Sequence, residues 1–558
     1  MTQVQPQFQL LHRRTQLPKL WDRILEPTVS TPSGKVRGQL REGIYGNTYY
    51  SFDGIPYAKP PLGKLRFKSP QPVESWLGVR DCTICPPKCV HANIYTGVID
   101  GIEDCLYLNV FTKKLHSAKP LPVLVYLYGG RFTAGDATRN SWGPDYFMMK
   151  DVILITIGYR LGALGFLSFP EPELQVPGNA GLKDIVMALQ WIKKNCQYFN
   201  GDPDNITLFG HSSGSQAAQL LMYLPQCENL FHKVILISGM QMHLRRIPQL
   251  EYRFAKHLGY KGKEDNHDIL AYLSALPAER LCDLKIWTPE ELKQCPLFVF
   301  SLTLENESAP DALLTKDPLD MYANKQSWCH SIPIVLGGNS FESLMHYNYF
   351  TKQPELYETL RKHPEYLLSH EVREKCDVHT QQQLAKKLVR LHLGAEELDI
   401  EQSFDVMRLS SYDFMYHPIY RYLKTRIPNA KAPTYLYRFD FDSPYFNLYR
   451  IKHFGSEVRG VSHVDELSYI FLMPNSFKLQ RNSKEFKMIE CMIDWITAFA
   501  RNSDPNCEKL SSLVWKPLTA DARYCLNISD ELSFVKWPEE EMCVLWDQYY
   551  KETGIRTF

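Results

Sequence analysis

The chain has 558 residues, of which 44% are hydrophobic and 13% aromatic, so it carries enough apolar side chains for a large buried core. Its 63 basic and 62 acidic residues nearly cancel and give a formal net charge of +1. No long run of like charge stands out, which argues against nucleic acid as a partner. No stretch approaches the roughly 18 uninterrupted apolar residues of a membrane-spanning helix.

An amphipathic segment, residues 1–27, precedes the predicted domain. Its apolar residues fall at helical spacing with charged residues between them: Leu17, Leu20, Trp21, Ile24 and Leu25. Residues 8–25 have two interpretations, a short helix in peripheral contact with a membrane surface or a helix docked on the fold. No signal-peptide apolar region follows Met1, so we expect a cytoplasmic protein, peripheral on intracellular membranes in the first interpretation.

The 14 cysteines are expected to be mostly reduced thiols in that compartment. One short stretch collects residue types that bind zinc: Cys82, Cys85, Cys89 and His91. No second half-site with zinc spacing follows, so the sequence predicts no metal site. No cofactor is expected either.

Strand-like and helix-like segments alternate along the chain. In order, they are strands at 121–127 and 151–157, a helix at 182–195, and strands at 206–209, 232–237, 332–336 and 434–439. Continuous apolar strands alternating with helices indicate an α/β fold with a central, mostly parallel sheet flanked by helices. No linker rich in Gly, Pro or Ser divides the chain, so residues 28–558 are predicted to form one domain with large helical insertions.

A Gly-x-Ser-x-Gly pentapeptide, residues 210–214, follows the strand at 206–209 and precedes a helix-compatible stretch at 215–222. Strand, sharp turn and helix are the context of a nucleophile elbow, in which a strained turn lifts a serine hydroxyl out at the end of a sheet. Ser212 is therefore the candidate nucleophile.

A serine nucleophile needs a base to take its proton and an acid to orient that base. In α/β-hydrolases these residues follow in the order serine, acid, histidine. Glu342 and His463 fit the order, and each lies just beyond a predicted strand, where it would reach the carboxyl edge of the sheet. On these arguments alone, His463 is one of 17 histidines and a structural role for it stays open.

Five sequence blocks are long, specific and ordered: residues 52–67 (FDGIPYAKPPLGKLRF), 103–109 (EDCLYLN), 159–167 (YRLGALGFL), 178–184 (GNAGLKD) and 202–210 (DPDNITLFG). With them the chain resembles the carboxylesterase–cholinesterase family, the type-B carboxylesterases, over nearly its whole length. The block at 142–147 (WGPDYF) looks most like the insect alpha-esterases. The resemblance implies an α/β-hydrolase fold and ester hydrolysis.

The resemblance also implies which residues form the site. The family pattern G-x-x-x-x-E-G places its acid on Glu342, with Ser343 in place of the usual glycine, and G-x-x-H-x-x-E places its base on His463. The expected oxyanion donors are the backbone N–H groups of Gly130, Arg131 and Ser213. Supporting positions behind the triad fall on His211, Ser238 and Glu466.

Two of these residues depart from the family. Arg131 stands in an oxyanion turn that relatives build from glycine, and a positive φ there would strain it. Its guanidinium has two interpretations: it lies near the reacting centre, or it points away and pairs with a local acid. His211 stands where most relatives have glutamate, so the two changes together remove one negative charge and add one positive charge near the site.

The segment from Cys89 to Cys105 closes a disulfide loop in secreted relatives. In a cytoplasmic chain, both residues are expected to be free thiols. The corresponding loop of cholinesterases supplies a tryptophan that faces the choline cation. No tryptophan lies between these two cysteines, so cholinesterase specificity is excluded.

The sequence thus predicts a serine carboxylesterase that hydrolyses a small-molecule ester through a Ser212 acyl-enzyme. Two alternatives stay open. One is a weakly active member that sequesters esters or organophosphates by acylation of Ser212. The other is a non-catalytic interaction protein, although such members of the family typically lose a triad residue and here all three are present.

Overall fold

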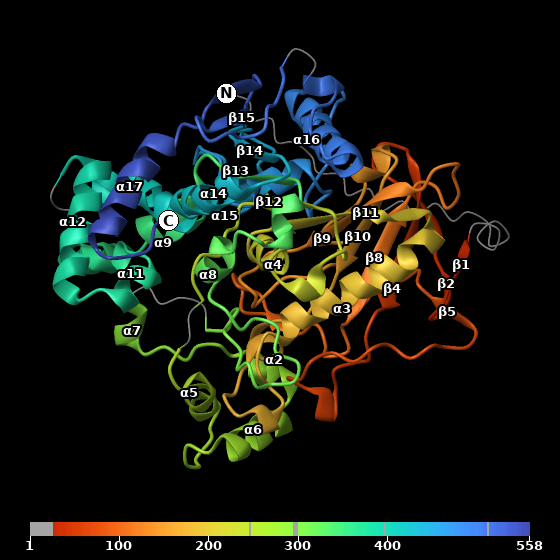
Figure 1. Cartoon of the computed structure of the whole chain (residues 1–558), viewed down its shortest axis with the longest axis horizontal. Helices are drawn as coiled ribbons and strands as arrows, with labels where there is room; N and C mark the ends of the chain where they lie inside the picture. The colour runs from red at the N-terminus through yellow and green to blue at the C-terminus, as the bar shows by residue number, and fades with distance from the viewer. Residues whose placement is uncertain (1–25, 245–246, 294–298, 396–397, 511–512) are drawn as a thin grey trace, which may run out of the picture.

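A computed structural model describes residues 26–244, 247–293, 299–395, 398–510 and 513–558. The centre of this part of the chain is an eleven-stranded sheet (Figure 1). From edge to edge its strands are β16 (Ser533–Lys536), β15 (Tyr524–Ile528), β14 (Thr434–Phe439), β13 (Ile334–Asn339), β12 (Lys233–Ile237), β11 (Gly201–His211), β9 (Leu121–Leu127), β10 (Ile153–Ile157), β8 (Tyr107–Thr112), β4 (Thr48–Pro56) and β3 (Gln39–Glu42).

The middle of the sheet is parallel. Every neighbouring pair from β10 across to β15 runs in parallel, whereas β8, β4, β3 and β16 are added antiparallel. Strands β9, β10, β12 and β13 are buried at every residue, as their continuous apolar sequences require when both faces are covered. The predicted α/β-hydrolase fold is confirmed, and each predicted strand occurs within a few residues of its expected bounds.

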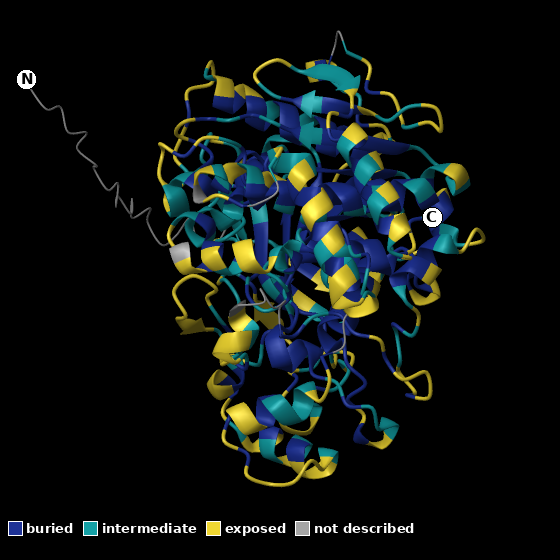
Figure 2. Ribbon diagram, turned by 90° about the vertical axis from the view of Figure 1, so that its left-hand side faces the viewer, coloured by how far each residue is buried: buried dark blue, intermediate teal, exposed yellow. Residues whose placement is uncertain are grey.

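Helices cover the sheet on both faces. The helix α16 (Lys484–Asn502) lies on one side of the central strands and α3 (Ala180–Asn195) on the other (Figure 1). The short helix α4 (Ser213–Leu221) packs against β9, β11 and β12. Figure 2 shows that buried residues fill the middle of the molecule while exposed residues mark the outer faces of its helices.

Most helices of the insertion between β13 and β14 build a second apolar core, to which α17 (Glu540–Glu552) contributes Trp546 and Tyr550. The buried apolar side chains of the last helix of the insertion, α14, belong to the main core instead. The helices of this insertion are α9 (Tyr347–Thr351), α10 (Pro354–Lys362), α11 (His370–Lys375), α12 (Val378–Leu393), α13 (Ser403–Ser411) and α14 (His417–Asn429). The other helices are α2 (Gly162–Phe166), α5 (Leu250–His257), α6 (Asn266–Ala275), α7 (Pro289–Lys293), α8 (Pro318–Ala323) and α15 (Leu448–Phe454).

Local sequence signals explain where the long helices begin and end. The side chain of Ser483 accepts a hydrogen bond from the N–H of Phe486 and caps α16, which stops at Ser503 with φ +63°. Asp377 caps α12 in the same way, and Gly394 ends it in the left-handed conformation. These are the residue types that satisfy the orphan backbone groups of a helix end.

The antiparallel strands β3, β4 and β8 are not predicted by the sequence analysis. Polar residues interrupt their apolar pattern: Ser51 donates to Asp53 inside β4, and buried Asn109 of β8 donates to the carbonyl of Ala137. A register shift between Phe52 and Ile55 further breaks the two-residue alternation. Small strands outside the main sheet are β1 (Thr28–Thr31), β2 (Gly34–Arg37), β5 (Val79–Asp81), β6 (His91–Ala92) and β7 (Ile99–Asp100).

Residues 1–25 lie outside the described residues, and with them the predicted amphipathic segment and its membrane contact at 8–25. Within the described ranges, no helix is both long and apolar enough to span a membrane. In the same ranges, no group of His, Cys, Asp and Glu side chains is placed to hold a metal ion.

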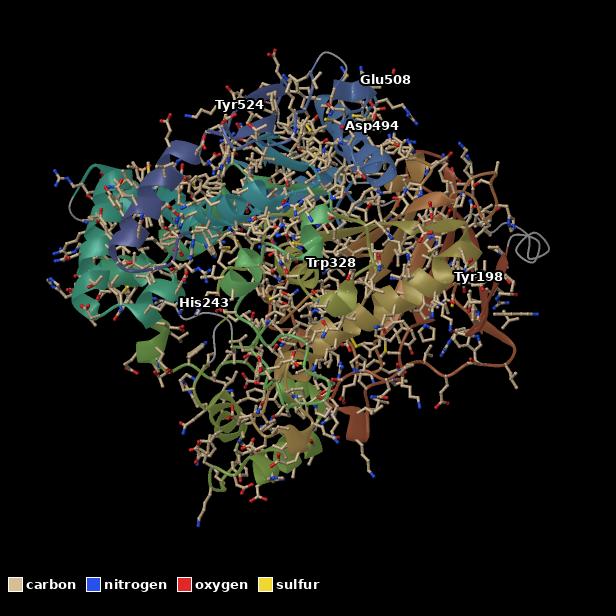
Figure 3. All side chains as sticks on the ribbon, viewed as in Figure 1. Tyr198, His243, Trp328, Asp494, Glu508 and Tyr524 are labelled. Carbon is tan, nitrogen blue, oxygen red and sulfur yellow. A yellow bond between two sulfur atoms is a disulfide. The ribbon has the colours of Figure 1, made fainter. Side chains whose placement is uncertain are left out.

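Exposed aromatic residues include Tyr198 and Tyr524, which lie on different sides of the molecule in Figure 3 and therefore form no common patch.

Cys89 and Cys105 form a disulfide, so the expectation of two free thiols is wrong for this structure. That expectation came from the presumed compartment and not from geometry. Ile102 pairs with the backbone beside Cys89, donating its N–H to Lys88 and accepting from Val90, and this folds the loop back on itself. The two Cα atoms are 4.8 Å apart, inside the range that a disulfide bridges.

The disulfide should protect Cys89 and Cys105 from alkylation and should stabilise the folded protein. Alkylation of the purified protein before reduction should leave Cys89 and Cys105 unmodified, and both should react after reduction. Replacing both by serine should lower the unfolding free energy by about 3 kcal/mol, because the bridge closes a loop of roughly 15 residues in the unfolded chain. Peptide mass spectrometry and thermal melts measure the two effects. Alkylation of both residues before reduction would contradict the pairing.

Candidate active site

Ser212 lies at the sharp turn between β11 and α4, with φ +54° and ψ −124°. The two flanking glycines permit this turn, because a Cβ on Gly210 would lie 2.4 Å from the Gly214 carbonyl oxygen and one on Gly214 would lie 2.1 Å from that of Leu127. The N–H of Ser212 donates to the Ile237 carbonyl of neighbouring β12 at 2.9 Å. Such a backbone costs on the order of 1–3 kcal/mol and is held by the surrounding fold.

Ser212, His463 and Glu342 form one chain of hydrogen bonds. Nε2 of His463 lies 3.0 Å from Oγ of Ser212, and Nδ1 lies 2.6 Å from Oε2 of Glu342. His463 is 3% exposed and Glu342 is fully buried, whereas Ser212 is partly accessible. The structure thus brings together the three residues that the sequence singled out, with the serine hydroxyl on the open side.

Glu342 is fixed where β13 ends. Its Oε1 accepts the N–H of Asn339 at 2.7 Å, and its carbonyl oxygen accepts the N–H of His463 at 3.3 Å. Ser343, which stands where relatives have glycine, is buried and donates its N–H to Oγ of Ser411 at the end of α13. This contact runs through the backbone, so it ties the position to the helical insertion without involving the serine hydroxyl.

The expected oxyanion turn follows β9 and is strained at two consecutive residues. Arg131 has φ +63° and Phe132 has φ +60°, so the strain predicted for a positive φ at Arg131 is present. Gly130 has φ +130°, and a Cβ there would lie 2.0 Å from the Ala134 carbonyl oxygen. The N–H of Phe132 donates to Oγ of Ser213 at 3.3 Å, which ties this turn to the elbow. Ser213 begins α4, so its N–H has no acceptor within its own helix.

The charge of the Arg131 guanidinium interacts with two phenols and with a second histidine near the site. Burial lowers its pKa, while the phenols of Tyr95 and Tyr449 act in the opposite direction. These phenols contact each other with a 2.5 Å distance between their oxygens. Burial, together with the charges of Arg131 and His463, lowers the pKa of His346 to about 3, so this imidazole is neutral at physiological pH.

His211 packs beside the imidazole of His463, with 4.9 Å between the two ring centroids. Burial, and to a lesser extent the charge on His463, lowers the pKa of His211 well below its usual range. The neutral ring of His211 therefore brings no positive charge to the site, but the negative charge that glutamate supplies at this position in most relatives is missing. Its Nε2 lies 3.6 Å from Oε1 of Glu466.

Glu466 sits behind the triad in a buried polar cluster. Its Oε1 accepts the hydroxyl of Ser238 at 2.7 Å, and its Oε2 accepts the side-chain amide of Asn339. Burial and the nearby charge of Glu342 raise the pKa of Glu466. The predicted supporting residues His211, Ser238 and Glu466 therefore meet at one place.

Several residues at the site are missed by the sequence analysis. Asn339 bridges Glu342 and Glu466, and Phe414 packs edge-on against the His463 ring at 5.6 Å between centroids. Phe414 comes from a π-helical turn, residues 412–416, and such turns frequently occur at functional sites. Tyr95 comes from a separate segment, whereas His346 ends the 3-10 helix that begins at Glu342, and only this closeness to Glu342 gives a signal in the sequence.

A serine hydroxyl bonded to an imidazole, which is bonded in turn to a buried carboxylate, can transfer the serine proton as the oxygen attacks an electrophilic carbonyl. Backbone N–H groups of turns beside such a serine can stabilise a developing oxyanion. The chemistry that this arrangement permits is acyl transfer to and from Ser212.

Comparisons with known proteins agree with this geometry. The model of the Carboxylesterase family matches residues 25–546. Esterase B1 of Culex pipiens is 33% identical over 537 residues, covering 94% of this chain and 98% of that protein. Juvenile hormone esterase of Tribolium castaneum is 31% identical over 526 residues, covering 90% and 88%.

Among solved structures, the juvenile hormone esterase of Manduca sexta, with OTFP covalently attached, superposes with a TM-score of 0.83 at 30% identity and covers 94% of this chain and 100% of that one. The family match spans the whole catalytic arrangement, from the oxyanion turn to His463. The chain therefore belongs to the carboxylesterase family and is a carboxylic ester hydrolase of the α/β-hydrolase fold.

Proposed function

We propose that this ester hydrolase works through an acyl-enzyme on Ser212, with His463 as the base and Glu342 as the acid that orients it. The observation that carries the proposal is the unbroken hydrogen-bond chain from Ser212 Oγ to Glu342 Oε2, which starts at a strained elbow. Attack of Oγ on the ester carbonyl passes the serine proton to His463. The imidazolium then protonates the leaving alcohol, and water deacylates Ser212 by the same route.

The tetrahedral oxyanion would be bound by the backbone N–H groups of Gly130, Arg131 and Ser213. These donors are expected to matter most in the transition state, because losing one oxyanion donor costs roughly 3 kcal/mol, or two to three decades in rate. The alternative for the same site is an acyl-enzyme that turns over weakly, and the strained turn at Arg131 is the feature that would slow the reaction. In that case the protein would sequester esters or organophosphates.

We further propose that the chain is an insect alpha-esterase acting on foreign esters. Support comes from the block at 142–147 and from the full-length similarity to Esterase B1. A purely non-catalytic role is disfavoured, because the three triad side chains are present and hydrogen-bonded to one another.

The triad assignment predicts that Ser212→Ala and His463→Ala each remove nearly all hydrolysis of an aryl ester without a large loss of folded protein. The double variant should be no worse than either single variant, because the residues act as a unit. Fluorophosphonate labelling and steady-state kinetics measure both effects. Substantial Ser212-independent turnover or labelling would refute the assignment.

Arg131→Gly should raise kcat/KM for a neutral ester, because glycine adopts the positive φ without a Cβ conflict and leaves the turn uncrowded. An ester of matched size that carries an anionic group distinguishes crowding from charge recognition. Crowding predicts a gain for that ester too, whereas recognition by the guanidinium predicts a loss that shrinks as salt rises. If neither ester responds at either salt concentration, Arg131 has no influence on the reaction.

His211→Glu should move the acid limb of kcat/KM against pH upward. The added negative charge stabilises the imidazolium, and a unit charge about 6 Å away at an effective dielectric of about 20 is worth roughly 3 kcal/mol, so the shift can reach about two pH units. The control is His211→Gln, which replaces one neutral polar group by another and should leave the midpoint in place. Equal midpoints for the glutamate and glutamine variants would show that this position exerts no electrostatic effect.

A further inference from the structure

His463 sits in a strained loop between α15 and a 3-10 turn, Asp465–Tyr469. The next residue, Val464, has φ +82°, which is a genuine outlier for a β-branched side chain. Backbone in this state persists only where the surroundings over-determine it. The contacts that hold this turn therefore also fix the direction of the His463 imidazole.

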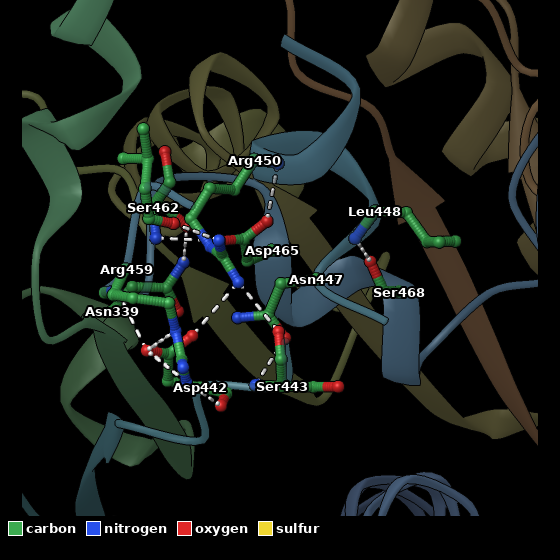
Figure 4. A network of polar contacts seen from close by, with 12 residues as sticks. Asn339, Asp442, Ser443, Asn447, Leu448, Arg450, Arg459, Ser462, Asp465 and Ser468 are labelled. Atoms are coloured by element: carbon green, nitrogen blue, oxygen red, sulfur yellow. Dashed lines mark hydrogen bonds and ion pairs between the residues drawn. The ribbon is translucent and has the colours of Figure 1, made fainter. Parts of the chain in front are cut away.

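The carboxylate of Asp465 spans the strained turn (Figure 4). Its Oδ2 accepts the N–H of Ser462 at 2.8 Å, on the other side of His463, and its Oδ1 accepts the N–H of Arg450 in α15 at 3.0 Å. Asp465 is fully buried, and burial raises its pKa while these two N–H groups and the Arg450 charge act against that shift. One side chain thus closes the turn and anchors it to a helix.

Arg450 ties the same carboxylate to the start of the loop. This side chain is fully buried, and its Nε lies 3.9 Å from Oδ2 of Asp465. Its Nη2 donates to the Ser443 carbonyl at 2.7 Å and to Asp442 at 3.1 Å, and its Nη1 donates to the carbonyl of Val458. The guanidinium therefore holds residues on both sides of His463 with fixed, planar geometry.

Asp442 and Asn339 complete the cluster. Asp442 accepts the N–H of Gly460 at 3.0 Å and the Arg459 side chain at 3.0 Å, which fixes the loop just before His463. The side-chain amide of Asn339 donates to the Ser462 carbonyl at 2.7 Å, and its backbone N–H donates to Glu342. The loop that carries the base is thus linked to the strand end that carries the acid.

We propose that Asp465 is a positioning residue of this esterase. Together with Arg450 it clamps the strained Ser462–Val464 turn, so that Nε2 of His463 stays within hydrogen-bond reach of Ser212. The inference rests on the proposed function of the triad. The clamp acts on the backbone of the turn, and it does not depend on contact with the substrate or with the reacting atoms.

The test is Asp465→Asn in the full-length enzyme, assayed with a small aryl ester. The asparagine amide cannot accept from both N–H groups, so one end of the turn is released. We expect kcat to fall roughly 10- to 100-fold, because displacing a catalytic group by about 1 Å costs on that order, while KM stays within about twofold. The rate of Ser212 labelling by a fluorophosphonate should fall in parallel.

A second substitution separates positioning from a general structural role. Val464→Gly, added to Asp465→Asn, lets the turn keep its positive φ without a Cβ conflict, so the strain that the clamp opposes is removed. The double variant should therefore recover kcat several-fold over Asp465→Asn alone. A merely structural loss would not be repaired by a glycine in the loop.

The matched control is Glu371→Gln in α11, which breaks another buried carboxylate–guanidinium pair, 2.6 Å long, with Arg421. This variant should lose a comparable amount of thermal stability and keep the wild-type kcat. If Asp465→Asn does not fold, Asp442→Asn decides, because Asp442 is a quarter exposed and holds the far end of Arg450. A several-fold lower kcat at unchanged KM in that variant supports the clamp.

Three results would overturn the clamp: a wild-type kcat in folded Asp465→Asn, a kcat loss in Glu371→Gln equal to that in Asp465→Asn, or a wild-type kcat in Asp442→Asn where Asp465→Asn does not fold. Failure of the proposed function is recognised separately, because turnover and labelling would then survive in Ser212→Ala. Loss of turnover in Ser212→Ala with normal kcat in Asp465→Asn would reject the clamp alone.

Discussion

The hydrogen bonds that join Ser212 to His463 and His463 to Glu342 are the contacts on which the account depends. They connect residues 251 and 121 positions apart in the sequence. Parallel strands bring such distant residues together, since β11 and β13 both end at the same edge of the sheet and each delivers its residue into the following turn. The geometry of the site is therefore a consequence of the sheet, and helices on both faces keep that sheet buried.

Several residues with strained backbone conformations lie around these hydrogen bonds. Five residues in or beside the site have positive φ values: Ser212, Arg131, Phe132, Ser238 and Val464. No one of these conformations is favourable for its residue, and each persists because hydrogen bonds from neighbouring elements over-determine it. The elbow is held by the Ile237 carbonyl, the oxyanion turn by Oγ of Ser213, and the histidine turn by Asp465. In the proposed mechanism, rigid support of this kind would preorganise the oxyanion donors and His463 before an ester arrives.

The order and type of the central elements could be predicted from the sequence, because short continuous apolar runs such as 121–127 are typical of strands buried on both faces. The antiparallel strands could not, since buried Ser51, Asp53 and Asn109 hide their alternation. Ser212, Glu342 and His463 followed from motif order together with family resemblance. Tyr95 gave no such signal, because folding brings it in from a separate segment. Asn339 and His346 lie close to Glu342 in the chain, but no motif assigns either of them a role.

Backbone strain at Arg131 and the redox state of Cys89 and Cys105 differ in how far they could be predicted from the sequence. Strain at Arg131 was expected if its place in a glycine turn gave it a positive φ, and the structure has that φ. The free thiols at Cys89 and Cys105 followed from a presumed compartment, and the folded loop instead brings the two Cα atoms to 4.8 Å. Steric requirements transfer directly from sequence to structure, whereas redox state depends on where the chain resides.

In the proposed mechanism, Ser212 carries the acyl group during turnover. The most direct measurement combines a rapid-mixing burst with a chromogenic aryl ester and peptide mapping of the acid-quenched enzyme. An acyl-enzyme on Ser212 should give a burst close to one equivalent of enzyme and an acyl group at Ser212, on the peptide that contains residues 210–214. A steady rate without a burst, together with no acylated Ser212 or an acyl group on another residue, would contradict it.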